Sequence, residues 1–121
     1  MFVRRAALIL AVMAVFVSAS SPAIDAATLI KGVATSNGPR WKPKSVSIAV
    51  GAKVTWKAVS GPHTVTAYKG PWNKNTALAQ GGTTSFTFKK KGVYKYRCLI
   101  TGHSTLVNGV CSGMCGKITV G

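Results

Sequence analysis

The stretch from Cys98 to Met114 constrains the fold of this chain most strongly, because it places three metal-binding side chains between two strand-like runs. Cys98 ends the first run, residues 94–98, His103 follows in the loop, and Met114 directly precedes the second run, residues 115–120. The chain has two histidines in all, and the other is His63. Two imidazoles, a thiolate and a weak axial thioether are the ligand set of blue-copper electron-transfer sites. The sequence therefore predicts one copper ion bound by these four residues.

The segments around these residues resemble the plastocyanin-like cupredoxins, the family of type 1 or blue copper proteins. The resemblance implies a Greek-key β-sandwich that binds one copper ion and carries one electron at a time. It also implies a protein that is not an enzyme, since one small domain has no second copper centre of the kind that oxidases and nitrite reductases need. The matching segments are Trp41-Lys42-Pro43, Gly51-Ala52-Lys53-Val54-Thr55-Trp56, Pro62-His63-Thr64-Val65 and Gly113-Met114-Cys115-Gly116-Lys117-Ile118-Thr119-Val120.

Alternation of apolar and polar residues independently predicts an all-β fold of seven or eight short strands. We expect residues 36–44 to form a loop, because they contain Gly38, Pro39 and Pro43. We expect residues 68–82 to be mostly irregular, with one helical turn at residues 76–80, and Trp56 and Trp72 to cover the core. The predicted strands are residues 28–34, 46–50, 54–58, 63–67, 83–88, 94–98 and 115–120, the last of which Ile118 and Val120 close.

The spacing inside the copper loop departs from that of the family. The ligand loop of plastocyanins has a spacing similar to Cys-x2-His-x4-Met. In this chain, four residues separate Cys98 from His103 and ten separate His103 from Met114. The Cys-x4-His spacing looks like that of azurin, whose axial methionine would fall at Val107. Either Met114 is the axial ligand after an insertion of residues 104–112, or the axial position near Val107 is empty. We favour Met114, because it continues directly into the last strand as in family members.

Two further cysteines, Cys111 and Cys115, bring the count to three. If Cys98 is the copper thiolate, these two remain as a pair that would form a disulfide in an oxidising compartment and brace the inserted loop. Their four-residue spacing permits a disulfide only if the loop turns back on itself. The alternative is that one of the two thiols joins the copper or takes up metal transiently.

The resemblance also predicts where electrons enter and leave. Arg97 stands at a position that is aromatic in plant plastocyanins, so the family's second, tyrosine-based electron port does not carry over to this chain. The port that we expect is the exposed edge of His103 and the apolar residues around it, Leu99, Ile100, Leu106 and Val107.

The first 26 residues predict export. A basic start at residues 1–5, a short apolar run at residues 6–17 and small residues at 18–21 describe a secretory signal peptide, and the apolar run is too short to span a membrane. Cleavage near Ala26 would leave residues 27–121 as one cupredoxin-like copper-binding domain. We expect a monomer without a transmembrane span, secreted or held in the periplasm or cell envelope.

The charge of the chain predicts acidic partners. The sequence has 16 Lys and Arg against 1 Asp or Glu, and residues 27–121 keep 14 of the basic residues and no acidic one. Such a domain is steered toward a redox partner with an acidic docking surface or toward anionic envelope polymers. The alternative is that the excess of positive charge is only a solvated surface that keeps the protein soluble. No motif of a nucleic-acid-binding protein accompanies the charge.

Two other functions fit the same residues. A copper carrier or sequestering protein of the cell envelope would use the same ligands, and its extra thiols and long loop would favour metal exchange. A basic β-sandwich that binds polyanions without a functional metal would keep that binding after the change Cys98→Ala. The electron carrier is the function that we favour.

Overall fold

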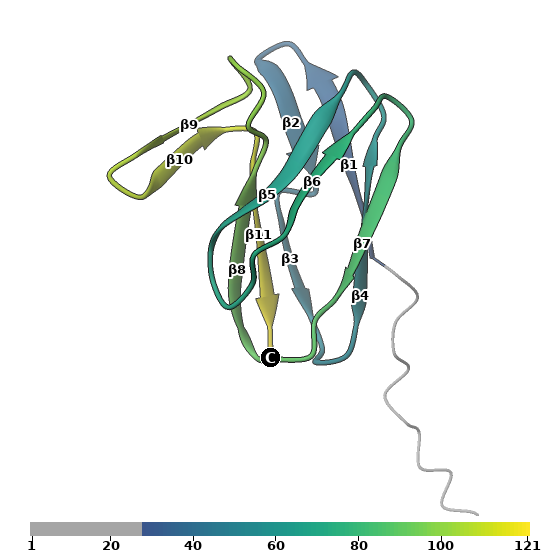
Figure 1. Cartoon of the computed structure of the whole chain (residues 1–121), viewed down its shortest axis with the longest axis vertical. Helices are drawn as coiled ribbons and strands as arrows, with labels where there is room; N and C mark the ends of the chain where they lie inside the picture. The colour runs from purple at the N-terminus through teal and green to yellow at the C-terminus, as the bar shows by residue number, and fades with distance from the viewer. Residues whose placement is uncertain (1–27) are drawn as a thin grey trace, which may run out of the picture.

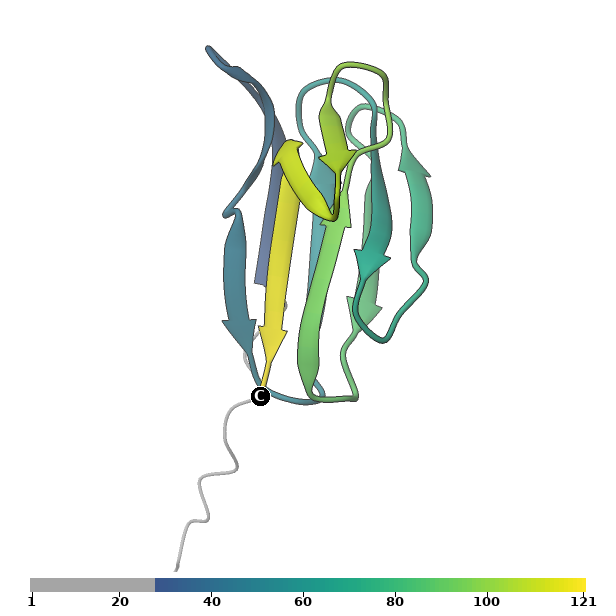
Figure 2. The same cartoon turned by 90° about the vertical axis from the view of Figure 1, so that its left-hand side faces the viewer.

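Strands with alternating apolar and polar residues form two sheets that pack face to face (Figures 1 and 2). The computed structural model describes residues 28–121, so the predicted signal peptide at residues 1–26 and the first residue of the predicted domain lie outside the described part. The four-stranded sheet has the order β2-β1-β4-β7, from β1 (Thr28–Thr35), β2 (Gly38–Lys42), β4 (Lys53–Ala58) and β7 (Thr83–Thr87). The five-stranded sheet has the order β3-β11-β8-β5-β6, from β3 (Ser45–Ile48), β5 (His63–Lys69), β6 (Asn75–Leu78), β8 (Gly92–Arg97) and β11 (Cys115–Val120).

A two-stranded hairpin of β9 (Ser104–Val107) and β10 (Val110–Gly113) projects from one end of the sandwich, the end opposite the C-terminus (Figure 1). The all-β sandwich is confirmed, although residues 28–121 contain 11 strands rather than seven or eight. Within these residues, the structure has no helix with the length and apolar character needed to cross a membrane.

The period-two pattern of each strand decides which side chains enter the core. In β8, Tyr94 and Tyr96 are buried while Lys95 and Arg97 face outward, as the sequence predicts. Gly116 on β11 lies directly opposite Tyr96 on β8. A Cβ atom at Gly116 would lie 2.0 Å from the tyrosine ring. Glycine at this position therefore leaves room for the ring between the two sheets.

The two tryptophans expected in the core are both there. Trp56 is fully buried, and Trp72 packs against it with 6.2 Å between ring centroids. A third, Trp41 of β2, is also buried and contacts the ring of Tyr96. These rings fill the space between the sheets and fix the distance at which the sheets pack.

Three local predictions were wrong. Residues 38–42 form β2, because Pro39 sits on an edge strand, where a missing backbone N–H is tolerated. Residues 75–78 form β6, because pairing with β5 overrides the weak local helical preference of the segment. The strand expected at residues 46–50 ends at Ile48, and Val50 is exposed in the turn that follows.

Candidate metal centre

Segments from distant parts of the chain meet at the end of the sandwich opposite the C-terminus (Figure 1), and they carry three metal-binding residues. His63 is the first residue of β5, Cys98 directly follows β8, and His103 directly precedes β9. Because β5 and β8 are antiparallel neighbours, the start of one and the end of the other lie at the same edge of the sheet. One metal-binding nitrogen or sulfur atom from each of these three residues lies within 4.8 Å of the others.

The three atoms form a nearly regular triangle. The Nδ1 atoms of His63 and His103 are 3.3 Å apart. The Sγ atom of Cys98 lies 3.9 Å from the Nδ1 atom of His63 and 3.4 Å from the Nδ1 atom of His103. The point equidistant from the three atoms is about 2.1 Å from each. Nitrogen and sulfur ligands keep roughly 2.0–2.3 Å from zinc, a neighbouring first-row ion. The triangle therefore fits one such metal ion without rearrangement.

The orientation of the His63 ring is fixed by a hydrogen bond behind it. Its Nε2–H donates to the carbonyl oxygen of Ser60 at 2.6 Å, so its Nδ1 carries the lone pair that faces the cluster. Burial lowers the pKa of His63 below its ordinary 6.5; the bond to Ser60 opposes this, and nearby His103 lowers the pKa further. The imidazole is therefore neutral at neutral pH, as a metal ligand must be.

Cys98 is fully buried and is the one free cysteine of the described residues. The backbone N–H of Thr64 donates to its sulfur at 3.3 Å, and the Thr64 hydroxyl accepts from the backbone N–H of Leu99 at 2.8 Å. Thr64 thus ties the β5 side of the site to the segment that carries the thiol. A hydrogen bond to the sulfur also stabilises the thiolate form, which is the form that binds metal.

Met114 is fully buried at the same end, whereas Val107 is 64% exposed on the projecting hairpin. The Met114 backbone N–H donates to the His103 carbonyl at 2.8 Å, and its carbonyl accepts from the Cys98 N–H at 3.1 Å. Both hydrogen bonds hold Met114 beside the segments that carry the other candidate ligands. Of the two positions considered from the sequence, the structure places Met114 at the cluster.

The remaining two cysteines form a disulfide, as the sequence analysis favoured. Cys111 on β10 is bonded to Cys115 on β11, with 6.1 Å between their Cα atoms. The chain turns back between them at Gly113, whose φ of 91° is readily adopted only by glycine. The disulfide joins the base of the hairpin to the last strand, on either side of Met114.

Two residues beside the site were missed by the sequence analysis. Gly32 of β1 faces it so closely that a Cβ atom there would lie 2.7 Å from His63 Cδ2 and 3.0 Å from Met114 Cε. Trp41 packs its ring edge-on to the His63 ring, with 5.6 Å between centroids. No local pattern singles out Gly32, because its role comes from the packing of the opposite sheet.

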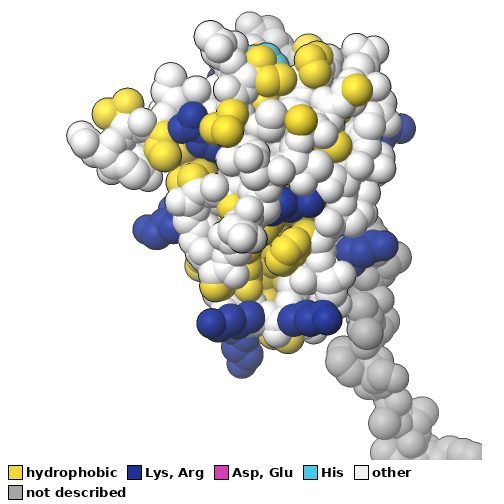
Figure 3. Space-filling view, viewed as in Figure 1, with side chains coloured by type: hydrophobic (Ala, Val, Ile, Leu, Met, Phe, Trp, Pro, Cys, Tyr) yellow, Lys and Arg dark blue, Asp and Glu magenta, His cyan; other side chains and the backbone are white. Residues whose placement is uncertain are grey.

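His103 is the cluster residue that reaches the surface. It is partly exposed, whereas His63 is buried, and the end of the molecule in Figure 3 shows histidine surface beside apolar side chains. Of the apolar residues expected around it, Leu99, Leu106 and Val107 are exposed, whereas Ile100 packs against the core. A surface hollow of about 270 Å³ beside His103 is lined by Arg40, Pro39, small polar residues and glycines, so the surroundings of the ring are only partly apolar.

The geometry defines a cupredoxin site, with two imidazoles and a buried thiol at one end of a β-sandwich and a methionine beside them. The chain belongs to the plastocyanin/azurin family of copper-binding proteins, whose family model matches residues 29–121. The family and the His-Cys-His cluster together identify the metal as one copper ion.

Solved structures share the fold. The reduced, Cu(I) form of an amicyanin variant is 22% identical with a TM-score of 0.61, and the match covers 80% of this chain and 84% of that one. A purple cupredoxin from Nitrosopumilus maritimus is 24% identical with a TM-score of 0.58, over 78% of this chain and 99% of that one.

A copper-containing nitrite reductase from Thermus scotoductus SA-01 is also similar, at 24% identity and a TM-score of 0.62. The match covers 79% of this chain but only 22% of the reductase. A comparison with curated proteins found no match.

Proposed function

We propose that this protein is an exported type 1 copper protein that carries one electron at a time, with copper bound by His63, Cys98, His103 and Met114. The observation that carries the proposal is the triangle of two Nδ1 atoms and one buried Sγ atom. When bound, copper supplies a Cu(I)/Cu(II) couple, which this set of soft and borderline donors accommodates in both states.

The protein's contribution is to hold the ligands still. Hydrogen bonds from Thr64 to Cys98, between His63 and Ser60, and between Met114 and His103 fix each ligand segment. A site that keeps one geometry in both charge states needs little rearrangement when an electron arrives or leaves. The partly exposed ring of His103 is the port that we propose for transfer, because the other three residues are buried.

Several features support a non-enzymatic role in the cell envelope. The described residues contain one cluster of metal-binding side chains, and the match covers most of the amicyanin variant and of the purple cupredoxin. The basic, apolar and small-residue pattern of residues 1–26 supports export, and the Cys111–Cys115 disulfide suits an oxidising compartment. We propose that the protein acts as a monomer and that its excess of positive charge steers it to an acidic surface on its redox partner or to anionic envelope polymers.

The test is the visible spectrum of the purified protein after addition of Cu(II). We expect an intense blue thiolate-to-copper band in the wild type and its loss in Cys98→Ser. The double variant Cys111→Ser/Cys115→Ser is the matched control and should keep the band, because the two disulfide sulfurs that it removes are not part of the triangle. A pale wild-type spectrum that Cys98→Ser leaves unchanged contradicts the proposal.

A copper carrier would use the same ligands, and kinetics separate the two functions. We expect a reversible one-electron couple in voltammetry and slow loss of copper to a chelator. The fully buried thiol and the ordered hairpin argue for slow exchange. Rapid transfer of copper to the chelator without a reversible couple would instead identify a carrier.

A further inference from the structure

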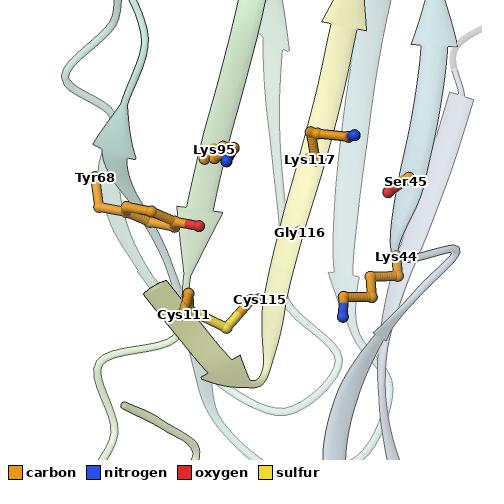
Figure 4. A pocket seen from close by; sticks show the side chains of 8 residues that line it. All are labelled: Lys44, Ser45, Tyr68, Lys95, Cys111, Cys115, Gly116 and Lys117. Carbon is orange, nitrogen blue, oxygen red and sulfur yellow. A yellow bond between two sulfur atoms is a disulfide. The ribbon is translucent and has the colours of Figure 1, made fainter. Parts of the chain in front are cut away.

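A basic hollow of about 200 Å³ lies on the outer face of the five-stranded sheet, on the side of β8 and β11 that faces away from the core (Figure 4). It is separate from the copper ligands, none of which lines it. Its lining combines three ammonium groups, two hydroxyl groups and a disulfide. The residues are Lys44, Lys95, Lys117, Ser45, Tyr68, Gly116, Cys111 and Cys115.

The lysines are brought together by strand register. Lys117 on β11 lies directly opposite Lys95 on β8, and Lys95 lies directly opposite Lys69 on β5. Like charges in directly opposed positions destabilise a sheet. Residues 28–121 contain no Asp or Glu, so no carboxylate side chain in the described part of the protein can neutralise this row. The fold thus maintains an uncompensated concentration of positive charge at one place.

Uncharged hydrogen-bond donors stand beside the charges. The Tyr68 side chain extends from β5 toward β8, and the Ser45 hydroxyl lies at the β3 side of the hollow (Figure 4). Burial raises the pKa of Tyr68 above its ordinary 10.0, although the charge of Arg97 opposes the shift. Its hydroxyl therefore keeps its proton at neutral pH and can donate to an anion.

The disulfide makes this a built hollow rather than a mobile surface. Cys111 and Cys115 form part of its wall and fasten the hairpin to β11. The donors come from β5, from β8, from β11 and from the start of β3, so they approach from several directions. The lining has no arginine, whose planar fork would match the two oxygens of a carboxylate, whereas lysines bind phosphate as point charges.

We propose that this hollow is a binding site for a phosphate group. Lys95 and Lys117 supply the main charge, Lys44 closes the β3 side, and the hydroxyl groups of Tyr68 and Ser45 donate to the remaining oxygens. A tetrahedral dianion can accept from all of these directions at once. The site does not depend on copper. It assigns a binding role to three of the basic residues of the domain, the lysines that line the hollow.

The test is calorimetric titration of the purified protein with inorganic phosphate at neutral pH, with ionic strength held constant by sodium chloride. We expect one saturable site and weaker binding of acetate. In Lys95→Gln/Lys117→Gln, affinity should fall by roughly tenfold or more, because both of the main charge-assisted hydrogen bonds to the anion are lost. Tyr68→Phe should weaken binding by a smaller factor.

The matched control is Lys53→Gln/Lys57→Gln, which removes the same charge from exposed positions of β4 on the other sheet. It should leave phosphate affinity within about twofold, since surface charges far from a site are screened by salt. Equal weakening in both double variants, or no saturable binding beyond that of chloride, overturns the proposal. Thermal unfolding of each variant checks that the fold is retained.

A second arm distinguishes the source of the phosphate group. The same variants are sedimented with vesicles of phosphatidylglycerol and of phosphatidylcholine. Retention on phosphatidylglycerol that is lost only in Lys95→Gln/Lys117→Gln supports the site and identifies a lipid headgroup. A calorimetric site with equal retention of all variants supports the site and identifies a free phosphate or a soluble phosphate ester.

Discussion

The substitution Gly32→Ala tests how closely the four-stranded sheet packs against the proposed copper ligands. The added Cβ atom would lie 2.7 Å from His63 Cδ2, 3.0 Å from Met114 Cε and 3.0 Å from Trp41 Cζ3. Carbon atoms in contact keep about 3.5–4.0 Å, so the nearest neighbour must move by about 0.8 Å. Overpacking of this kind costs about 1–3 kcal/mol. For a domain of this size, a loss of about 2 kcal/mol lowers the Tm by roughly 8–16 °C.

The displaced atom belongs to a proposed ligand, so the effect on the copper-loaded protein should exceed that on the metal-free protein. Scanning calorimetry of both forms and a competition assay for copper measure the two effects. Gly121→Ala is the control, because a Cβ atom there meets nothing within 4 Å. A Gly32→Ala variant that matches the control in Tm and in copper affinity refutes the argument that this glycine makes room for the site.

Four other outcomes are expected. Met114→Leu should retain copper with a changed reduction potential, and an unchanged voltammogram and spectrum would rule out the axial role. Copper at a hundredfold excess over its Kd should stabilise the protein by about 2.7 kcal/mol in urea unfolding, and a chelator should reverse this. Cys111→Ser/Cys115→Ser should cost about 2 kcal/mol of stability from the lost loop closure, whereas an unchanged urea midpoint would show that the disulfide does not stabilise the fold. Gly109→Val should lower the stability of the hairpin by about 1–2 kcal/mol, because the φ of 77° is unfavourable for valine. The rate of hydrogen exchange at residues 104–113 should then rise, while the rate in β8 stays constant.

The sequence predicted most of the core because period-two patterns act locally. Tyr94, Tyr96 and Cys98 alternate with Lys95 and Arg97 in the sequence, and all three are buried. His63 and Val65 alternate with Thr64 in the same way and are also buried, with His63 at the end of their row. Because β5 and β8 are antiparallel neighbours, the start of β5 and the end of β8 meet at the same edge of the sheet. The buried histidine and the buried thiol could be placed in this way, whereas His103 lies outside the strands and was assigned from the ligand set and the family resemblance.

What the sequence analysis missed depends on contacts between segments or on turn chemistry. β2 and β6 are edge strands, and each is held by pairing with a single neighbouring strand. Their own residues therefore indicate a strand poorly. The hairpin is different, because Asn108 and Gly109 both have positive φ, and Asn-Gly between short strands is a strong hairpin signal. That signal was present in the sequence and predicts two strands within the inserted loop at residues 104–112.

The backbone bonds around Met114 also separate the hairpin from the metal site. The His103 carbonyl and the Met114 N–H close the base of the hairpin, and the next bond ties Met114 to Cys98. The hairpin is therefore a side branch whose length can change while its two ends stay together. Its exposed tip at Asn108 is a natural point for grafting a foreign peptide or an electrode linker onto the protein. A graft there would lie at the far end of the hairpin from His103, the proposed electron port, close enough to direct docking without touching a proposed ligand.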